Sequence, residues 1–151
     1  MFEVKISKLD HFDDKLALPS YETKLAAGAD IRACLGIGQR MEIKVGQRVL
    51  IPTGLAFEIP AGFEIQVRPR SGLSLKTGLL VVNSPGTIDA DYRGEVKIIM
   101  GNLGDHTEVI EHGDRVAQLV MAPITQAHFV ITDELSSTER GSGGFGSTGR
   151  K

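Results

Sequence analysis

Short runs of alternating apolar and polar residues, separated by turn residues, are the feature that most constrains the fold of this 151-residue chain. A period of two is typical of β-strands, because successive side chains of a strand point to opposite faces of a sheet. Helical periodicity is nearly absent, and turn sequences such as IPAGF, SPGT, NLGDH and EHGD recur at regular intervals. The expected strands cover residues 2–6, 41–45, 48–59, 63–67, 79–82, 95–100, 107–111, 115–124 and 128–132.

This spacing of strands predicts an all-β protein, an antiparallel sandwich or barrel, with the jelly roll as the favoured form. The stretch SGLSLKTG, residues 71–78, is expected to carry one short helix. The chain has the size of a single domain with its own core. We expect that domain to cover residues 1–135, and the glycine- and serine-rich residues 136–151 to form an appended flexible arm.

Composition excludes several classes of protein. A hydrophobic fraction of 41% and a formal net charge of -2 indicate a soluble globular protein that does not bind nucleic acid. Apolar runs stay below the roughly 20 residues that cross a bilayer, and the N-terminus resembles no signal or transit peptide, so we expect a cytoplasmic protein without a membrane partner. Cys34 is the single cysteine, which excludes an internal disulfide, and the histidines lack the spacing of a zinc site.

The segment RPRSGLSLKTG contains groups that suit a phosphate. Arg70 supplies a forked cation, and Ser71 and Gly72 supply a hydroxyl and closely approachable backbone amides. Such a turn can form a concave nest of N–H groups that binds an anion. The alternative is a solvated turn in which Arg70 only takes part in a surface ion pair.

The segment NSPGTIDADYRGE places two carboxylates, Asp89 and Asp91, two residues apart in an expected hairpin. In extended geometry both point to one face, where they could hold a metal ion or one could act as a general base. Acidic residues in hairpins are also ordinary turn residues. Tyr92 beside them indicates a ring that packs against another group.

Two more polar residues interrupt apolar segments. Asp30 in KLAAGADIRA is expected at a strand end, beside a glycine that lets a ligand approach, or else it is a capping or turn aspartate. Gln118 in GDRVAQLVM either faces solvent or reaches a buried polar partner.

The C-terminal segment RGSGGFGSTGRK is either a disordered tail or a flap that orders over a phosphorylated ligand. Residues 144–151 nearly match a P-loop, but Arg150 replaces the lysine and no Ser or Thr follows it. The match is therefore not a P-loop. Its arginines, hydroxyls, exposed amides and single ring, Phe145, nevertheless suit a nucleotide.

Taken in this order, five segments resemble the trimeric deoxyuridine triphosphate nucleotidohydrolases, the dUTPases. The segments are AGADIRA, PRSGLSLKTG, NSPGTIDADYRGE, GDRVAQLV and RGSGGFGSTG, which together span residues 27–149. The resemblance implies a jelly-roll (β-clip type) homotrimer in which each active site is shared by three chains. It also implies Mg²⁺-assisted hydrolysis of dUTP to dUMP and pyrophosphate, which cleans the nucleotide pool and supplies dUMP for thymidylate synthesis.

The resemblance also implies roles for single residues. Asp89 is the implied general base for water attack on the α-phosphate, with Arg70 and Gln118 as further catalytic residues. Asp30 is the implied ligand of Mg²⁺ through water. The implied substrate-binding residues are Arg70, Ser71, Gly72, Asn83, Gly86, Thr87, Ile88, Asp89, Tyr92, Gln118, Arg140, Gly144, Phe145, Gly146, Ser147 and Thr148.

Within that set, Asn83 and the hairpin backbone would pair with the uracil edge, and Tyr92 would pack under the deoxyribose and exclude a 2′-hydroxyl. The arm, from a third subunit, would bring Arg140 to the γ-phosphate and stack Phe145 on the base. One departure concerns Gly101 in IIMGNLG, where a larger strand residue is expected.

Two alternatives stay open. A dCTP deaminase shares the fold but needs an acid–base residue in its base pocket, and residues 83–88 contain no carboxylate. The other alternative is a non-catalytic nucleotide sensor or a structural β-trimer. The presence of Asp30, Arg70, Asp89 and Gln118 together argues against a loss of catalysis but leaves room for an additional binding role.

Overall fold

The computed structural model describes residues 3–144 of the chain. Its helix is α1 (Ser71–Lys76). The strands are β1 (Lys5–Lys8), β2 (Gly28–Arg32), β3 (Arg40–Ile43), β4 (Arg48–Pro52), β5 (Leu55–Glu58), β6 (Phe63–Arg68), β7 (Leu79–Val81), β8 (Gly86–Ile88), β9 (Lys97–Asn102), β10 (Glu108–Glu111) and β11 (Arg115–Pro123). The predicted all-β composition and the short helix within residues 71–78 are therefore confirmed.

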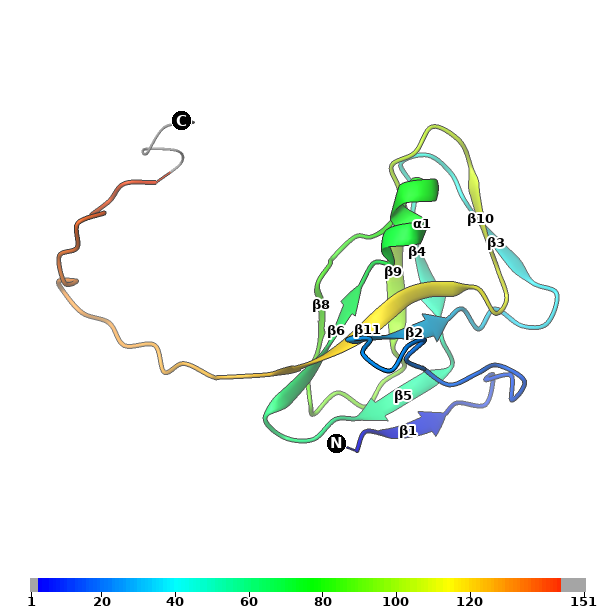
Figure 1. Ribbon diagram of the computed structural model, residues 1–151, viewed down its shortest axis with the longest axis horizontal. Helices are drawn as coiled ribbons and strands as arrows, with labels where there is room; N and C mark the ends of the chain where they lie inside the picture. The colour runs from blue at the N-terminus through cyan, green and yellow to red at the C-terminus, as the bar shows by residue number, and fades with distance from the viewer. Residues whose placement is uncertain (1–2, 145–151) are drawn as a thin grey trace.

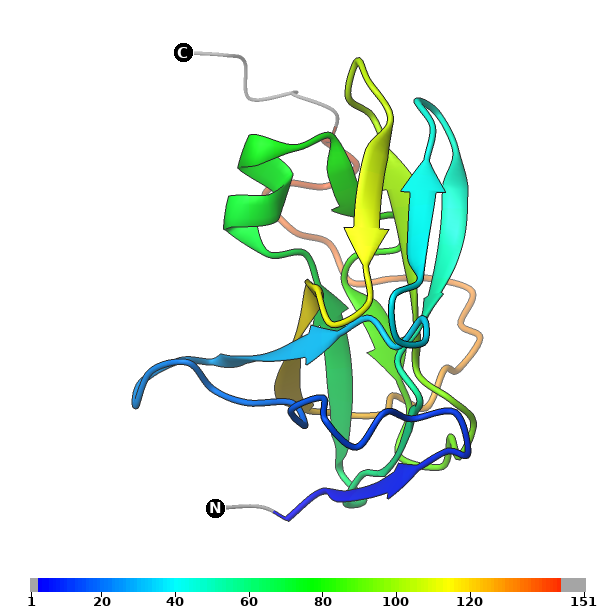
Figure 2. The same ribbon diagram turned by 90° about the vertical axis from the view of Figure 1, so that its right-hand side faces the viewer.

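All strand pairs among the described residues are antiparallel (Figures 1 and 2). The largest sheet has the order β2–β11–β6–β8, and a second sheet has the order β4–β9–β7. Two ribbons, β1–β5 and β10–β3, complete the body. Figure 1 shows α1 and the β1–β5 ribbon at opposite ends of the molecule. Over residues 3–144, no helix is long and apolar enough to cross a membrane.

The core follows the alternation of the strands. In β9, Ile98 and Met100 are buried while Ile99 between them is exposed. They join Ile31 of β2 and Ile51 of β4 in one cluster of buried apolar side chains. Burying a side chain of this size contributes about 1.5–3 kcal/mol, so each position of this cluster stabilises the fold.

Residues 48–59 form two strands instead of the single run expected, because the chain turns at Thr53 and Gly54. Gly54 has φ of 68°, in the left-handed region that favours glycine. A Cβ atom at Gly54 would also lie 3.1 Å from the Cα atom of Phe12. The turn lets β4 pair with β9 while β5 pairs with β1.

Residues 128–132 do not form the strand that alternation predicts. The last strand ends at Pro123, and Phe129, Val130 and Ile131 are 92%, 74% and 97% exposed. Figure 1 shows this segment leading away from the body. A strand needs a neighbour for its N–H and C=O groups, and no other strand of residues 3–144 pairs with this segment.

The structure shows why a glycine suits position 101, which the sequence alone does not reveal. Gly101 lies in β9 between Arg48 of β4 and Leu80 of β7. A Cβ atom at this position would approach Cγ2 of Val82 to 2.9 Å. A larger residue at this position would therefore require the Val82 side chain to move, and glycine avoids that contact.

Candidate active site

Two arginines and two carboxylates meet where β2, β6 and β11 lie side by side. Nε of Arg70 donates to Oδ1 of Asp30 at 3.0 Å, and its Nη1 donates to the main-chain oxygen of Arg115 at 3.1 Å. Nη1 of Arg115 lies 3.1 Å from Oδ2 of Asp30 and 3.1 Å from Oε2 of Glu22. We call Glu22, Asp30, Arg70 and Arg115 the arginine–aspartate cluster. Its opposite charges balance, and the contacts to Asp30 and to the main-chain oxygen of Arg115 hold Arg70 in place.

The order of the strands explains this cluster. Gln118 of β11 lies opposite Asp30 of β2 and also opposite Arg68 of β6. β6 ends at Arg68, so Arg70 follows the sheet by two residues and lies close enough to turn back to Asp30. Strands far apart in the sequence thus bring two of the expected functional residues together.

Gln118 reaches a protein partner. Its Nε2 donates to the main-chain oxygen of Pro69 at 2.8 Å. A Cβ atom at Gly28 would lie 2.2 Å from Oε1 of Gln118. The space beside Gly28 is therefore taken by Gln118, where the sequence suggested an approach for a ligand.

Ser71 and Gly72 are the first residues of α1, and both are exposed. Backbone amides at the start of a helix have no acceptor within the helix. A Cβ atom on Gly72 would meet no heavy atom within 4 Å. The amides beside Arg70 are thus open to an anion, as the phosphate interpretation requires.

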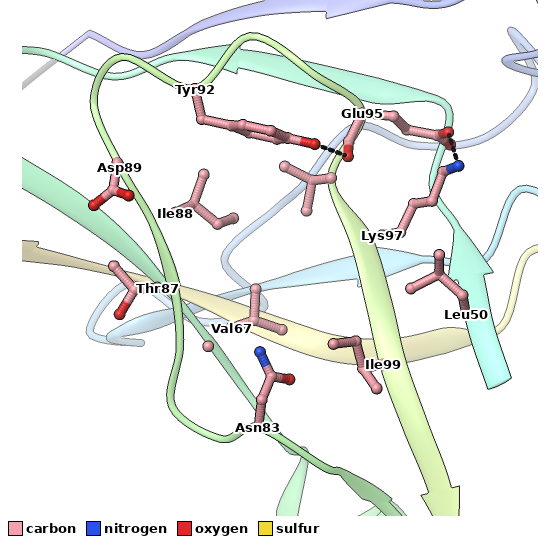
Figure 3. Close-up of a pocket in the computed structure, with 12 residues that line it drawn as sticks. Leu50, Val67, Asn83, Thr87, Ile88, Asp89, Tyr92, Glu95, Lys97 and Ile99 are labelled. Carbon is pink, nitrogen blue, oxygen red and sulfur yellow. Dashed lines mark hydrogen bonds and ion pairs between the residues drawn. The ribbon is translucent and has the colours of Figure 1, made fainter. Parts of the chain in front are cut away.

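A cavity of about 480 Å³ lies beside β8 (Figure 3). It is lined by Leu50, Val67, Asn83, Gly86, Thr87, Ile88, Asp89, Tyr92, Glu95, Val96, Lys97 and Ile99. We call it the hairpin cavity. Leu50 of β4, Val67 of β6 and Ile99 of β9 give it an apolar wall. Its volume lies in the usual range for small-molecule sites, roughly 300–1,000 Å³.

β8 positions the polar side of the hairpin cavity. Figure 3 shows Thr87 and Asp89 on one side of the strand and Ile88 on the other. A Cβ atom at Gly86 would lie 2.9 Å from Nδ2 of Asn83, so this glycine leaves room for the amide. The peptide bond between residues 84 and 85 is cis.

Asp89 and Asp91 do not line the same cavity. Residues 90 and 91 form a turn after β8, in which the Tyr92 amide donates to the main-chain oxygen of Asp89 at 3.2 Å. Asp89 lines the hairpin cavity, whereas Asp91 does not. The expectation of a common face was wrong because the backbone is not extended between them.

Tyr92 and Glu95 close the opposite end of the hairpin cavity from Asn83 (Figure 3). The Tyr92 hydroxyl donates to the main-chain oxygen of Glu95 at 3.0 Å. Burial alone would raise the pKa of the Glu95 carboxyl, but hydrogen bonds from the Gly54 amide and from His11 outweigh burial and lower it. Glu95 is therefore held as a carboxylate.

The predicted site residues fall into two groups that do not share one cavity. Six of them line the hairpin cavity: Asn83, Gly86, Thr87, Ile88, Asp89 and Tyr92. The others on the body, Asp30, Arg70, Ser71, Gly72 and Gln118, are not among its lining residues.

Of the predicted arm residues, the structure describes Arg140 and Gly144. Arg140 is exposed, and its Nε donates to the main-chain oxygen of Gly143 at 2.8 Å. Gly144 is the last described residue. The predicted residues Phe145, Gly146, Ser147 and Thr148 lie outside the described part of the chain.

Sequence reasoning missed four charged residues of these sites: Glu22 and Arg115 of the arginine–aspartate cluster, and Glu95 and Lys97 of the hairpin cavity. Arg115 bridges Asp30 and Glu22, and Glu95 lines the hairpin cavity. Glu22 and Lys97 lie outside the motifs that the sequence singles out, whereas Arg115 and Glu95 lie inside two of them, GDRVAQLV and NSPGTIDADYRGE. Their place in those motifs was the only available signal, because their partners are distant in the chain.

Comparison with known proteins gives a consistent result. The dUTPase family model matches residues 14–149. The deoxyuridine 5'-triphosphate nucleotidohydrolase of Roseobacter denitrificans is 55% identical over 149 residues, covering 99% of this chain and 97% of the relative. The corresponding protein of Desulfotalea psychrophila is 60% identical over 136 residues, covering 90% of this chain and 89% of its own.

Among solved structures, the dUTPase of Staphylococcus bacteriophage 80alpha with dUPNHPP has a TM-score of 0.85 to this structure. It is 27% identical, and the match covers 99% of each chain. The antiparallel fold of residues 3–144, with the short helix α1, is thus a jelly roll of the type found in dUTPases. The chain belongs to the dUTPase family, which confirms the resemblance seen in its motifs.

Proposed function

We propose that this member of the dUTPase family hydrolyses dUTP to dUMP and pyrophosphate, by water attack on the α-phosphorus with Asp89 as the general base. The observation that carries the proposal is the hairpin cavity, which combines the Asn83 amide, the Tyr92 ring and the Asp89 carboxylate around an apolar wall. A base, a sugar and an attacking water need groups of these three kinds.

Selection of the base and sugar follows from the shape of the hairpin cavity. Asn83 lies at one end, and its amide can both donate to and accept from the uracil edge, with the β8 backbone beside it. Tyr92 lies at the other end, where its ring packs under the deoxyribose and leaves no space for a 2′-hydroxyl. The tight apolar wall excludes the methyl group of thymine.

The phosphates bind to the other group of residues, supplied by a neighbouring subunit. Arg70 offers a guanidinium that can hold two phosphate oxygens, and Ser71 and Gly72 offer the open turn beside it. Gln118 acts at the α-phosphate. Phosphoryl transfer depends mainly on positioning and on neutralising charge, so this group is as necessary as the base.

Mg²⁺ is the proposed cofactor, held through water by Asp30. Each Asp30 oxygen accepts from one arginine, which leaves lone pairs that can accept from water ligands of an ion. Among the described residues, no group of three or more His, Cys, Asp or Glu could cage a metal. Both facts fit Mg²⁺, which keeps several waters and takes few protein ligands. When bound, the ion would neutralise and orient the phosphate oxygens.

We further propose a homotrimer with a body of residues 1–135 and an arm of residues 136–151 that completes a neighbour's site. The support is the separation of the two residue groups and the exposed apolar side chains of Phe129, Val130 and Ile131. The arm would bring Arg140 and residues 144–148 to the substrate, with Phe145 stacked on the uracil. The cytoplasmic location predicted from the sequence belongs to the same proposal.

The decisive experiment measures pyrophosphate release from dUTP by the purified protein, with Mg²⁺ and after chelation. We expect dUMP and pyrophosphate in equal amounts with Mg²⁺, little product after chelation, and weak reaction with UTP and dTTP. Absence of pyrophosphate release from dUTP with every divalent metal supplied would rule out the proposal.

One observation bears on a deaminase. Glu95 is a carboxylate on the wall of the hairpin cavity, which is the kind of group that a deaminase needs. However, its Oε1 accepts from the Thr53 and Gly54 amides, and its pKa is lowered, so it is a poor proton donor to a base. Ammonia release from dCTP, measured in the same preparation, separates the two reactions.

A further inference from the structure

The ring of Tyr92 is held by its own chain. Its hydroxyl donates to the main-chain oxygen of Glu95 at 3.0 Å. A Cβ atom at Gly94 would lie 2.4 Å from the Tyr92 hydroxyl oxygen and 2.6 Å from Cζ, so the ring lies directly on this glycine. With Tyr92 47% exposed, a face of the ring is left for a ligand.

The Glu95 side chain in turn binds its segment to the turn between β4 and β5. Oε1 of Glu95 accepts from the backbone amides of Thr53 at 3.2 Å and Gly54 at 2.9 Å. The same atom lies 3.0 Å from Nε2 of His11, and Oε2 lies 3.4 Å from Nζ of Lys97. The side chain is only 11% exposed, so these contacts are largely shielded from water.

The turn that receives Glu95 is itself rigid. Gly54 has φ of 68°, and its main-chain oxygen accepts from the Leu9 amide at 2.9 Å. The Thr53 hydroxyl donates to the main-chain oxygen of Val96, and the Val96 amide donates to the oxygen of Leu55 at 2.9 Å. Residues 95 and 96 are therefore bound to this turn through both side-chain and main-chain atoms. The carbonyl that receives the Tyr92 hydroxyl cannot shift unless these contacts change.

We propose that Glu95 is a positioning residue for sugar selection, since its carboxylate fixes the carbonyl that holds Tyr92 against Gly94. The inference rests on the proposed placement of the deoxyribose on Tyr92. Glu95 touches neither the phosphates nor the attacking water in this arrangement. Its loss changes which sugar is accepted more than the rate of the chemical step.

The first test replaces the carboxylate. We expect Glu95→Ala to lower the ratio of kcat/KM for dUTP over UTP by about tenfold, mostly through KM, with kcat for dUTP changed by less than about threefold. Glu95→Gln keeps one oxygen that can accept from the turn amides, so it should keep most of the selectivity. Glu58→Ala is the matched control: it removes a glutamate bound to Lys5, outside the hairpin cavity, and should leave the ratio unchanged.

The second test removes the hydroxyl of Tyr92, the donor in its hydrogen bond to the main-chain oxygen of Glu95. Tyr92→Phe keeps the ring but removes the hydroxyl that donates to Glu95. We expect Tyr92→Phe alone to lower the selectivity ratio in the same direction, and to add little when combined with Glu95→Ala. Such non-additivity is the signature of two residues that act through one contact.

The outcomes separate this inference from the proposed function. If Tyr92→Ala relaxes sugar selection while Glu95→Ala lowers only Tm or lowers kcat/KM for both nucleotides equally, the positioning role is wrong and the proposed function stands. Should Glu95→Ala fail to fold, a Tyr92→Phe enzyme with full selectivity would overturn the inference by itself. Failure of the wild-type protein to hydrolyse dUTP would instead remove the proposed function.

Discussion

At the scale of single residues, two glycines give site side chains their places. A Cβ atom would lie 2.2 Å from Gln118 at Gly28 and 2.9 Å from Asn83 at Gly86. The sequence indicated Gly28 as a place where a ligand approaches, but the space belongs to a side chain of β11. A glycine can be read from a sequence, whereas the group that uses its space cannot, because that group is often distant in the chain.

The role proposed for Asp89 predicts the effect of a single isosteric change. Asp89→Asn keeps the shape of the side chain and the main-chain bond to the Tyr92 amide, but the new amide cannot take a proton from water. We expect kcat for dUTP to fall by roughly 10²–10⁴-fold with little change in substrate binding. Steady-state kinetics and calorimetric titration with a non-hydrolysable dUTP analogue measure the two effects.

The neighbouring carboxylate supplies the control for this experiment. Asp91→Asn makes the same chemical change two residues away, at a side chain that does not line the hairpin cavity. It should retain activity within about threefold. Near-normal turnover of Asp89→Asn would remove Asp89 from the role of base.

At the scale of elements, segments with partners in the same chain form as their alternation predicts. β9 is an example, with β4 on one side and β7 on the other. Residues 128–132 have an equally β-like sequence, yet they form no strand with residues 3–144. Alternation shows that a segment can be a strand, but a neighbouring strand must satisfy its backbone.

The arm can be tested as an element. Ending the chain after Glu139 removes Arg140 and the glycine-rich residues, and the described part of this segment, residues 140–144, pairs with no strand of the body. We expect assembly and Tm to be unchanged, while kcat/KM for dUTP falls about tenfold or more, because a stacked ring alone is worth roughly 1–3 kcal/mol. Size-exclusion chromatography, thermal unfolding and steady-state kinetics give the three readouts.

A shorter deletion serves as its control. Ending the chain after Gly149 removes Arg150 and Lys151 but keeps Arg140 and Phe145. This protein should retain most of its activity, because Arg140 is the proposed γ-phosphate ligand. Full activity of the chain that ends at Glu139 would show that the arm is not part of the site.

At the scale of the whole molecule, the main finding is the division of the site residues between the arginine–aspartate cluster and the hairpin cavity. Asp89 lines the hairpin cavity, whereas Arg70 belongs to the cluster and is not among the residues that line the cavity. A reaction that needs both is most simply completed by a second copy of the chain. The proposed symmetric trimer provides one such contact for each site.

Mixing of variant subunits tests this arrangement. Arg70→Ala and Asp89→Asn proteins should each be nearly inactive alone. A mixture refolded from equal amounts of the two should recover about a quarter of the wild-type activity, because each site draws its two residues from different chains and both are intact in about one site in four. If native mass spectrometry shows mixed trimers and no activity returns, Arg70 and Asp89 act from the same chain.

Local patterns were sufficient for much of this protein. Alternation with a period of two and regular turns indicated an antiparallel all-β fold, and the segment at residues 71–78 indicated its helix. The five motifs indicated the family, since each is a short continuous stretch of sequence. These properties depend on residues that are neighbours in the chain, so no distant contact had to be known.

Other features depended on the tertiary structure, because they arise from residues far apart in the sequence. Three contacts of this kind join separate segments of the chain. Arg115 pairs with Asp30, Gln118 occupies the space beside Gly28, and Glu95 accepts from the turn at residues 53–54. Burial, register and available space are set by such contacts and not by spacing along the chain. For the same reason, the resemblance implied a shared site, but only the folded chain showed which of its residues line the hairpin cavity and which belong to the arginine–aspartate cluster.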